Sequence, residues 1–385
     1  MTSKATLTKL GDVLNITSGY AFKSEKFRDT GGLPLVRIRD VKRGYSETYY
    51  DGPFDEKYVL GNEDLLVSMD GEFRTAMWEG GKALLNQRVC RLEPDLKKVD
   101  KSYLFYFLAP KLKVIEDRTP FVTVKHLSAK SIREITIPLP PLSEQKRIAA
   151  ILDKADAIRK KRKQAIGLTE TFLRSTFLEM FGDPVTNPKG WEKVSIEAVG
   201  EVQGGLQVTQ KRKNNPIEVP YLRVANIYRD ELWLDEVKSI RLTQNELDRV
   251  RLKAGDVLIV EGHGNKEEIG RSAVWTGEIN PCAHQNHLIR VRLDPEKVLP
   301  IYVSNFLNSE GGRRQMFRAS RTTSGLNTIS TRTVKETKLP IPPFEQQKKY
   351  FDLVARCSVI KSKIISSDAN NLFNSLVQKA FRGEL

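Results

Sequence analysis

The stretches "PLPPLSEQKRI" (138–148) and "PIPPFEQQKKY" (340–350) are two versions of one pattern, 202 positions apart. Proline fixes φ and lacks a backbone donor, so such a run is expected to end a sheet and to stay out of helix interiors. The residues that follow, Ser-Glu-Gln and Glu-Gln-Gln, put capping or acidic side chains where free N–H groups and the helix dipole favour them. Each copy therefore predicts the end of a domain and the start of a helix.

Four further pairs of segments repeat in the same order along the chain. They are LPLVRIRDV (33–41) with VPYLRVANI (219–227), NEDLLVSMDG (62–71) with AGDVLIVEGH (254–263), NQRVCRL (86–92) with QNHLIRV (285–291), and FLRSTFLEMF (172–181) with LFNSLVQKAF (372–381). Self-similarity of this kind is the signature of a duplicated unit. The offset grows from 186 to 199 over the first three pairs and then stays near 200, which indicates two copies that differ in their loops but keep one helix length.

The segments after the proline runs, 142–183 and 344–385, contain 42 residues each and no proline. Apolar residues recur in both near every third or fourth position, which predicts amphipathic helices or a coiled-coil seam. The seam residues are Ile148, Leu152, Ala155, Ile158, Ile166, Leu173, Phe177 and Phe181, then Leu353, Cys357, Ile360, Ile364, Leu372 and Leu376. Neither helix can bury its stripe alone, so we expect the two to pair, antiparallel if a two-fold axis relates the copies.

The segments before the proline runs contain short stretches rich in Val, Ile and Leu, broken by Gly, Asn and Asp, which predict strands. A few short helices are expected among them, at 102–110 and 301–308. The predicted fold class is α+β, with two mostly-β domains separated by two long antiparallel helices and an internal pseudo-two-fold repeat. The predicted boundaries are 1–142 for the first domain, 143–183 for the central helix, 184–343 for the second domain and 344–385 for the C-terminal helix.

Composition points to a globular protein with a polyanionic partner. The 385 residues include 63 Lys and Arg against 48 Asp and Glu, a formal net charge of +15, and a basic balance of this kind favours nucleic acid. Three widely spaced cysteines predict no disulfide framework and a reducing compartment. No stretch has the length of a signal-peptide core or a membrane span, so a cytoplasmic location without membrane contact is expected.

Three motifs have some features of a catalytic, metal or phosphate-binding site, but none has the residues or spacing that would make such a site specific. "IPPF" (341–344) has the shape of an amino-methyltransferase motif, but Ile341 stands where that chemistry needs a hydrogen-bonding side chain. Cys282, His284 and His287 lack the second Cys-x-x-Cys of a zinc site. The five basic residues of 159–163 spread around a helix, which is typical of a solvated face, although contact with DNA phosphate or an acidic partner stays open.

The duplicated junctions, "FLEMFGDP" (177–184), the terminal "KAFRGEL" (379–385) and "LGDVLNITSGYAFKS" (10–24) together give the chain a resemblance to the specificity subunits of type I restriction-modification enzymes. The resemblance covers essentially the full length. It implies two target recognition domains, each reading half of a split double-stranded DNA sequence, with the helical pair setting the spacer.

The same resemblance implies that the chain is not catalytic and carries no cofactor of its own. Its expected partners are two modification subunits that methylate adenine with S-adenosylmethionine, and restriction subunits that use ATP and Mg²⁺. A self-contained methyltransferase or nuclease would need catalytic motifs in additional residues. A nucleic-acid-binding structural scaffold without bipartite DNA specificity, including an RNA scaffold, remains the alternative.

Base reading needs donors and acceptors on loops, whereas phosphate contacts need positive charge. The predicted DNA-binding residues of the first domain are Lys23, Ser24, Arg37, Arg39, Arg74, Lys125 and His126. Those of the second domain are Gln207, Gln210, Lys211, Arg212, Arg223, Asn226, His263, Asn265, Lys266, Arg271, Arg321 and Asn327. Arg37 and Arg223 stand out because both copies keep them, although a shared residue could instead serve structure.

Partner subunits are expected to bind along the helices and at the two junctions. The predicted partner-binding residues are Pro140, Pro141, Glu144, Gln145, Pro342, Pro343, Gln346 and Gln347. Changing them is expected to weaken assembly before it weakens the folding of either domain.

Overall fold

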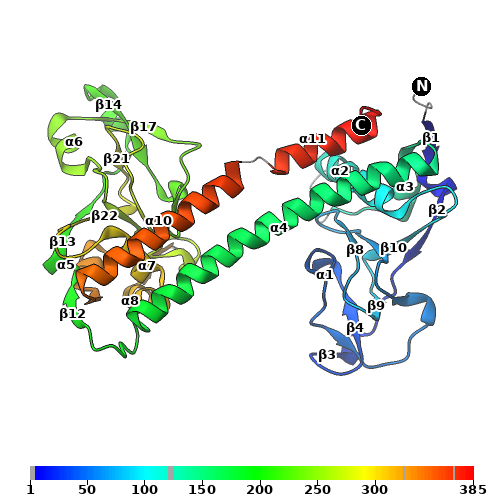
Figure 1. The fold of residues 1–385 in the computed structure, drawn as a ribbon, viewed down its shortest axis with the longest axis horizontal. Coiled ribbons are helices and arrows are strands. Elements are labelled where there is room, and N and C mark those ends of the chain that lie inside the picture. The colour runs from blue at the N-terminus through cyan, green and yellow to red at the C-terminus, as the bar shows by residue number, and fades with distance from the viewer. Residues whose placement is uncertain (1–4, 120–124, 324–325, 367–368) are drawn as a thin grey trace. The chain divides into compact units, whose positions relative to one another are not determined.

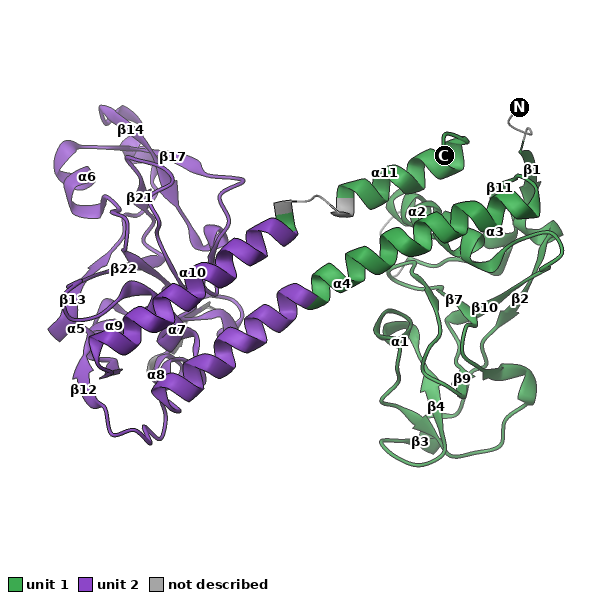
Figure 2. Cartoon of the chain, viewed as in Figure 1, with its two compact units in different colours: residues 1–164, 365–385 green, residues 165–364 purple. Residues whose placement is uncertain are grey.

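The computed structural model describes residues 5–119, 125–323, 326–366 and 369–385, and it divides into two compact units (Figure 2). Unit 1 contains residues 1–164 and 365–385, and unit 2 contains residues 165–364. The boundary falls inside α4 (Leu142–Phe181), a continuous helix of 40 residues, so each unit includes part of it. The element order is drawn in Figure 1.

Unit 1 combines short strands with few helices. Its strands are β1 (Thr6–Lys9), β2 (Leu14–Ser18), β3 (Phe27–Arg28), β4 (Leu33–Val36), β5 (Tyr49–Tyr50), β6 (Val59–Leu60), β7 (Leu65–Ser68), β8 (Thr75–Met77), β9 (Ala83–Leu85), β10 (Val89–Pro94) and β11 (Thr136–Leu139). Its helices besides α4 are α1 (Ile38–Arg43), α2 (Lys101–Arg118), α3 (Ala129–Arg133) and α11 (Ala369–Arg382), with 3-10 turns η1 (Leu10–Asp12), η2 (Ser24–Lys26) and η3 (Glu56–Tyr58).

Unit 2 repeats this plan with longer loops. Its strands are β12 (Glu192–Ser195), β13 (Gly200–Gly204), β14 (Ile217–Leu222), β15 (Ile227–Tyr228), β16 (Glu231–Leu232), β17 (Lys238–Leu242), β18 (Val257–Val260), β19 (Gly262–His263), β20 (Ser272–Val274), β21 (Ala283–His284), β22 (Leu288–Leu293), β23 (Arg321–Thr323), β24 (Leu326–Thr328) and β25 (Lys338–Ile341). Its helices are α5 (Ile196–Val199), α6 (Gln244–Val250), α7 (Pro300–Asn308), α8 (Glu310–Ala319), α9 (Thr331–Glu336) and α10 (Phe344–Ser366), with 3-10 turns η4 (Gln210–Asn214), η5 (Val224–Asn226) and η6 (Lys266–Glu268).

The central sheets of the two units have the same antiparallel topology. Unit 1 has the order β2-β10-β7-β8, and unit 2 has the matching order β13-β22-β18-β20. In each unit a second sheet holds one parallel pair, β4 with β9 and β14 with β21. The predicted α+β class, with two sheet-rich regions, long helices and an internal repeat, is confirmed.

The first and last strands of each unit pair with one another. β1 pairs with β11, and β12 pairs with β25. Pro138 and Pro340, the first prolines of the two runs, lie inside β11 and β25. Both strands end inside the runs, at Leu139 and Ile341, as expected. The first proline of each run is accommodated because a two-stranded pair has a free edge on each strand where a missing N–H is tolerated.

Both long helices begin directly after the second proline of their Pro-Pro pair, at Leu142 and Phe344. The carbonyl of Pro141 accepts hydrogen bonds from the N–H groups of Glu144 and Gln145, and the carbonyl of Pro343 accepts from Gln346 and Gln347. The two helix starts are thus built alike, although Ser143 in one copy is replaced by Glu345 in the other.

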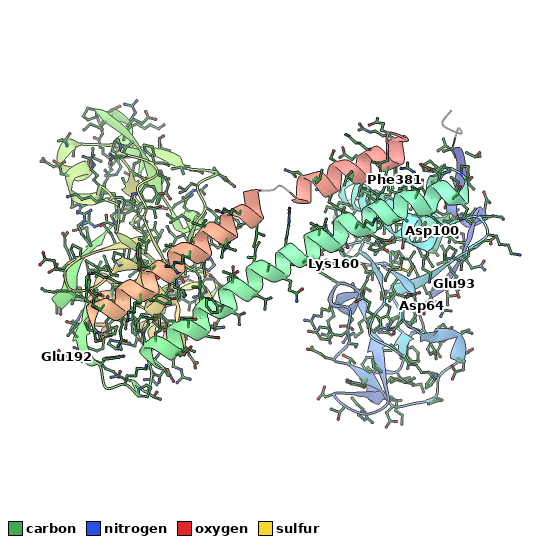
Figure 3. The ribbon with its side chains drawn as sticks, in the orientation of Figure 1. Asp64, Glu93, Asp100, Lys160, Glu192 and Phe381 are labelled. Carbon is green, nitrogen blue, oxygen red and sulfur yellow. The ribbon has the colours of Figure 1, made fainter. Side chains whose placement is uncertain are left out.

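A buried glutamine ties each helix start to the domain that precedes it. Gln145 is 1 % exposed, accepts the N–H of Asp100 at 2.9 Å, and donates to the carbonyls of Lys98 and Pro140, each at 2.9 Å. Asp100, labelled in Figure 3, is the N-cap of α2. The side-chain amide therefore links the starts of α2 and α4.

The second copy repeats this arrangement with Gln347. It is fully buried, accepts the N–H of Leu299 at 2.9 Å and donates to the carbonyl of Pro342 at 2.9 Å. Leu299 is the N-cap residue of α7, the counterpart of α2. The repeated proline-glutamine pattern thus encodes a hydrogen-bonded junction in each unit.

The core of unit 1 takes residues from both of its long helices. Ile148 and Leu152 of α4 join Phe373 and Val377 of α11 in one apolar cluster. The ring of Phe381, labelled in Figure 3, lies 5.0 Å from that of Tyr103 on α2.

The two helices of unit 1 run in opposite directions. At one end Arg147 donates to the Leu385 carbonyl at 2.8 Å, and further along α4 Arg159 lies 4.5 Å from the ring of Phe373.

Unit 2 has an equivalent core at the other end of α4. Phe177 and Phe181 pack with Tyr350 of α10 and with Tyr302 of α7, and the Phe181 and Tyr302 rings are 4.8 Å apart. Phe181 thus has the role in unit 2 that Phe381 has in unit 1. Lys361 of α10 pairs with Glu170 at 3.2 Å, so α4 and α10 are antiparallel within this unit.

The C-terminal helical segment differs in detail from the prediction. The structure describes two helices, α10 and α11, and residues 367–368 between them lie outside the described residues. Ile158, Ile360 and Leu372, predicted as seam residues, are 52 %, 52 % and 62 % exposed. Periodicity identified the helices, but it overstated how far along them the apolar stripe is buried. Within the described part of the chain, no helix is both long and apolar enough to cross a membrane.

Candidate nucleic-acid interface

Four loops of unit 1 meet at one end of its central sheet, which we call the loop edge. The end of β2, the end of β7 and the start of β10 coincide there, since Ser18 pairs with Cys90 and Ser68 with Val89. Backbone hydrogen bonds join the loops that follow. Met69 donates to the carbonyl of Arg88 at 2.8 Å.

The segment before α3 and the arginine after β4 reach the same edge. Leu127 donates its N–H to the Met69 carbonyl at 2.7 Å, and Gly71 donates to the Lys125 carbonyl at 2.9 Å. Asn86 donates to the carbonyl of Val36, the residue before Arg37, at 3.3 Å. The sheet thus brings together residues that lie up to about ninety positions apart in the sequence.

Unit 2 has the same loop edge. Glu261 donates to the His287 carbonyl at 2.9 Å, and Ile329 donates to the Glu261 carbonyl at 2.9 Å. Gln285 donates to the carbonyl of Leu222, the residue before Arg223, at 2.9 Å. Each of these bonds has its counterpart in unit 1, so the duplicated sequence builds two copies of one backbone frame.

A glycine in each copy allows two of these loops to touch. A Cβ placed on Gly19 would lie 2.0 Å from the carbonyl oxygen of Asn86, and one on Gly205 would lie 2.2 Å from that of Gln285. These are contacts with backbone, which cannot rotate away. Close backbone approach therefore explains glycine at both positions.

At the centre of the unit 1 loop edge, one carboxylate holds two basic side chains. Asp70 has a side chain 8 % exposed, and it forms an ion pair with Nη1 of Arg88. Nδ1 of His126 lies 2.6 Å from Oδ1 of the same carboxylate. Because a carboxylate can accept but not donate, the His126 Nδ1 carries the shared proton. The side chains of Arg88 and His126 remain 55 % and 54 % exposed.

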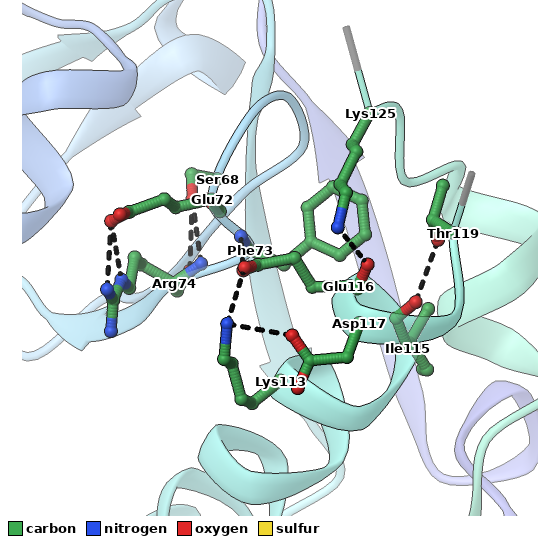
Figure 4. A network of polar contacts seen from close by, with 10 residues as sticks. All are labelled: Ser68, Glu72, Phe73, Arg74, Lys113, Ile115, Glu116, Asp117, Thr119 and Lys125. Carbon is green, nitrogen blue, oxygen red and sulfur yellow. Dashed lines mark hydrogen bonds and ion pairs between the residues drawn. The ribbon is translucent and has the colours of Figure 1, made fainter. Parts of the chain in front are cut away.

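The turn that contains Asp70 is attached to the end of α2 by a buried glutamate, Glu116 (Figure 4). Glu116, 8 % exposed, accepts from Lys113 Nζ and from the N–H of Phe73, each at 2.8 Å. The hydrogen bond from Lys113, assisted by that of Phe73, holds the pKa of Glu116 below its ordinary value despite burial. Lys125 donates from Nζ to the Glu116 carbonyl at 2.5 Å. Glu116 thus positions two loops of the edge.

Unit 2 has a different acidic and basic pair, because Gly262 stands at the position of Asp70 and Glu261 stands at the position of Met69. Nδ1 of His287, at the position of Arg88, lies 3.9 Å from Oε2 of Glu261. Burial raises the pKa of Glu261 to about 7. The same frame therefore presents an arginine beside a buried aspartate in one unit and a histidine beside a readily protonated glutamate in the other.

The predicted DNA-binding residues of unit 1 fall into three places. Lys125 and His126 lie on the loop edge, and Arg74 lies on its β7–β8 turn, where Glu72 holds the guanidinium at 2.9 and 3.0 Å. Lys23 and Ser24 are exposed where η2 begins, after the loop that follows β2.

Arg37, the N-cap residue of α1, and Arg39, within α1, complete the unit 1 set. Arg37 is exposed at the start of α1, whereas Arg39 donates to Thr48 Oγ1 at 3.0 Å. All seven predicted residues of the first domain thus remain at least partly accessible.

In unit 2, several predicted residues line the β19–η6 segment and its partner strand. They are His263, Asn265, Lys266 and Asn327, and the backbone of β24 joins them by pairing with β19. Arg321 belongs to β23, and its side chain lies outside the described residues.

A second group gathers around η4, away from that segment. Gln210 and Arg212 line an open hollow of about 440 Å³ together with Arg241, and Lys211 is exposed beside them. Arg212 is bound to Glu246 at 2.6 Å and to the Gln207 carbonyl at 2.8 Å, so its charge is largely committed within the protein.

Two predicted DNA contacts in unit 2 need correction. Asn226 is 2 % exposed, accepts the N–H of Arg223 at 3.0 Å and donates to the carbonyls of Trp233 and Glu236. Its counterpart Asp40 accepts the N–H of Arg37 at 2.9 Å. The repeated Arg-x-x-Asp and Arg-x-x-Asn pattern therefore encodes a helix-start cap, and Asn226 presents no side-chain group to a ligand.

Arg271 is likewise part of the interior. It is 5 % exposed, bonded to Glu268 at 2.8 Å and to the Val224 carbonyl at 2.9 Å, and its guanidinium lies 4.7 Å from the ring of Tyr228. An arginine buried and paired in this way cannot reach DNA in this conformation.

The predicted partner-binding residues also separate into buried and exposed members. Gln145 and Gln347 are buried in the junction bonds described above and offer no surface to a partner, which corrects the prediction for them. Pro342 is buried as well. The remaining members are at least partly exposed, namely Pro140, Pro141, Glu144, Pro343 and Gln346.

Sequence reasoning missed Asp70, Arg88 and Glu116. Arg88 carried a usable signal, because the repeat aligns it with another basic residue, His287. Asp70 and Glu116 gave no comparable signal, since the contacts of Asp70 with Arg88 and His126 and of Glu116 with Phe73 join segments that are apart in sequence. Within the described part of the chain, no group of three or more His, Cys, Asp or Glu residues is placed to hold a metal ion.

Comparison with known protein families gives a match along most of the chain. The family model for the type I restriction modification DNA specificity domain matches twice, over residues 3–168 and 188–366. The two matches fall on the two copies of the repeat.

Curated proteins of the same kind align over nearly the whole sequence. The chain is 30 % identical over 413 residues to the type I restriction enzyme EcoBI specificity subunit of Escherichia coli, covering 98 % of this chain and 85 % of that protein. It is 24 % identical over 419 residues to the EcoKI specificity subunit of Escherichia coli strain K12, covering 98 % and 89 %.

Solved structures share the fold. The crystal structure of a type I restriction-modification system S subunit from M. genitalium has a TM-score of 0.61 at 14 % identity, and the match covers 98 % of this chain and 96 % of that one. A chain from a structural study of complex assembly and conformational transition in a type I R-M system has a TM-score of 0.53 at 16 % identity, over the whole of both chains.

Proposed function

Because the chain belongs to the type I restriction-modification DNA specificity family, we propose that it gives such a complex its DNA sequence specificity. Each unit contributes one recognition domain, and each domain reads one half of a bipartite duplex sequence. The recognition domains are assigned to residues 1–142 and 184–343, and the helical segments 143–183 and 344–385 separate the half-sites.

The observation that carries this proposal is the repeated loop edge with different side chains. The backbone bonds around Asn86 recur around Gln285, yet Arg88 is replaced by His287 and Lys125 by Asn327. A shared frame with different donors and acceptors is suited to reading two different base sequences in the same way. The net charge of +15 supports a polyanionic ligand.

We further propose that the chain itself is not catalytic. Two modification subunits would supply adenine methylation with S-adenosylmethionine, and restriction subunits would supply DNA translocation and cleavage with ATP and Mg²⁺. The specificity chain would act by binding the DNA and these subunits in a fixed position relative to one another.

Exposed apolar side chains on the long helices support subunit docking there. Large apolar residues normally lie inside, and several together on one helix mark an interaction surface. On α4 and α10 the side chains of Leu168, Phe172, Phe351, Val359 and Ile360 are between 48 % and 61 % exposed.

The test is to co-express the chain with its modification subunit and to map methylated adenines across the host genome at single-base resolution. The expected result is a split motif, two short defined blocks around a fixed undefined gap. Replacing residues 1–142 by those of another family member should then change one block and leave the other intact.

A control separates this function from the scaffold alternative. The complex is first purified and shown to be assembled and stable. Methylation without any preferred motif, or none at all from such a complex, would contradict the specificity role and favour a nucleic-acid-binding scaffold.

A further inference from the structure

We propose that Arg88, held by Asp70, reads a guanine in the half-site bound by unit 1. This inference rests on the proposed function and extends it to one residue and one base. Neither residue was among those that the sequence alone identified.

The first step is that Arg88 is fixed and yet accessible. Nη1 of its guanidinium is paired with Asp70, a carboxylate whose own side chain is 8 % exposed, while the arginine side chain is 55 % exposed. Within the described part of the chain, this carboxylate is the sole hydrogen-bond partner of the Arg88 side chain. Four of its five N–H donors therefore remain for a ligand.

The second step concerns the backbone of Arg88. Its φ angle is +72°, in the left-handed region that non-glycine residues seldom occupy. Such a conformation persists where surrounding contacts over-determine it, and it is concentrated at ligand sites. The Arg88 carbonyl is held by the N–H of Met69, on the same turn as Asp70.

Third, the surroundings of Arg88 favour contact with a DNA base over contact with a phosphate. A phosphate contact needs positive charge and little direction, and a buried carboxylate beside the arginine weakens that charge. Guanine presents O6 and N7 side by side, which matches two parallel N–H groups of a guanidinium held in a fixed direction. An arginine fixed by an aspartate is therefore better suited to guanine than to phosphate.

The fourth step is the position of Arg88 in the repeat. His287 occupies the same site in unit 2 beside Glu261. The basic side chain is kept at this position, but its acidic partner is not, because Gly262 stands where unit 1 has Asp70. The arginine held by a buried carboxylate is therefore particular to unit 1, as expected for a position where the two half-sites are read differently.

The test uses the full chain co-expressed with its modification subunit, and the readout is the genome-wide methylation motif. Arg88→Lys keeps the positive charge but removes the paired N–H groups of the guanidinium, and Arg88→Gln removes both the charge and the guanidinium. Asp70→Asn removes the negative charge that holds the Arg88 guanidinium in place. Arg43→Gln, an exposed arginine of α1 paired with Glu47, is the matched control.

We expect Arg88→Lys and Arg88→Gln each to lower the preference for G·C over other base pairs by about tenfold or more at one position of the methylation motif. That position should lie in the half of the motif that changes when residues 1–142 are exchanged for those of another family member. Asp70→Asn should relax the same position, and Arg43→Gln should leave the motif unchanged. Thermal unfolding of each variant complex checks that it is assembled and folded.

Three results would overturn the inference while leaving the proposed function intact. One is a wild-type unit 1 block made only of A·T pairs. Another is an unchanged motif in all Arg88 variants. The third is a uniform loss of methylation across all sites in Arg88→Gln with full activity in Arg88→Lys, which would make Arg88 a phosphate contact. If instead the wild type gave no bipartite motif, the proposed function itself would fail.

Discussion

Replacing Gln145 by alanine should destabilise unit 1 by about 3 kcal/mol. The side chain makes three hydrogen bonds of 2.9 Å while 1 % exposed, and each such bond contributes roughly 1 kcal/mol net. A loss of about 3 kcal/mol corresponds to a more than hundredfold rise in the equilibrium constant for opening the junction.

Native-state hydrogen exchange followed by mass spectrometry measures this opening in the intact chain. The Asp100 N–H is bonded to Gln145 Oε1, so peptides covering the start of α2 report directly on the lost contact. Gln347→Ala, which removes two bonds, should destabilise unit 2 by about 2 kcal/mol. Exchange in the other unit should stay unchanged in each case.

Glu144→Ala is the matched control, because that side chain is partly exposed and pairs with the exposed Arg147. It should change stability by less than about 0.5 kcal/mol. Unchanged exchange at α2 in Gln145→Ala, together with lost binding of the modification subunit, would instead place the glutamine at a subunit interface and contradict a role in the junction.

Two further predictions concern the loop edges. Gly19→Ala should lower the free energy of unfolding by about 1–3 kcal/mol, because its Cβ would overlap the Asn86 carbonyl. Gly61→Ala is the control and should leave the free energy of unfolding unchanged, because there is open space around Gly61. Equal stabilities of the two variants in denaturant titrations would count against the close approach of Gly19 to Asn86. Burial raises the pKa of Glu261 to about 7, so the folded state holds a proton that the unfolded chain releases near its ordinary value of 4.5. Stability should therefore fall by on the order of 2 kcal/mol as pH rises from 4.5 to 7, and Glu261→Gln should remove this fall; an identical pH profile in the variant would exclude Glu261 as its source.

Local rules were reliable where neighbours in sequence determine the outcome. The proline runs mark the helix starts at Leu142 and Phe344, because a proline restricts its own φ and the residue before it. Apolar periodicity identified the long helices for a similarly local reason. The duplicated segments predicted two units of the same topology, which their central sheets have.

The same local rules failed where a polar residue has distant partners. Gln145 looks like a surface residue in sequence, but its buried side chain is satisfied by the N–H of Asp100 and the carbonyl of Lys98, 45 and 47 positions away. Arg271 and Arg88 carry the same side chain, yet one is 5 % exposed and the other reaches solvent beside Asp70. Burial is a property of the packed chain, so residue type alone could not separate them.

A duplicated α+β chain, the starts of its long helices and a basic character suited to nucleic acid follow from the amino-acid sequence. These properties depend on composition, periodicity and proline geometry, which act over a few residues. Three features depend on the packed structure: the repeated glutamine closes a junction, α11 completes the core of unit 1, and Asp70, Arg88 and His126 form one cluster. Each of these depends on contacts between segments far apart in sequence, which form when sheets and helices pack.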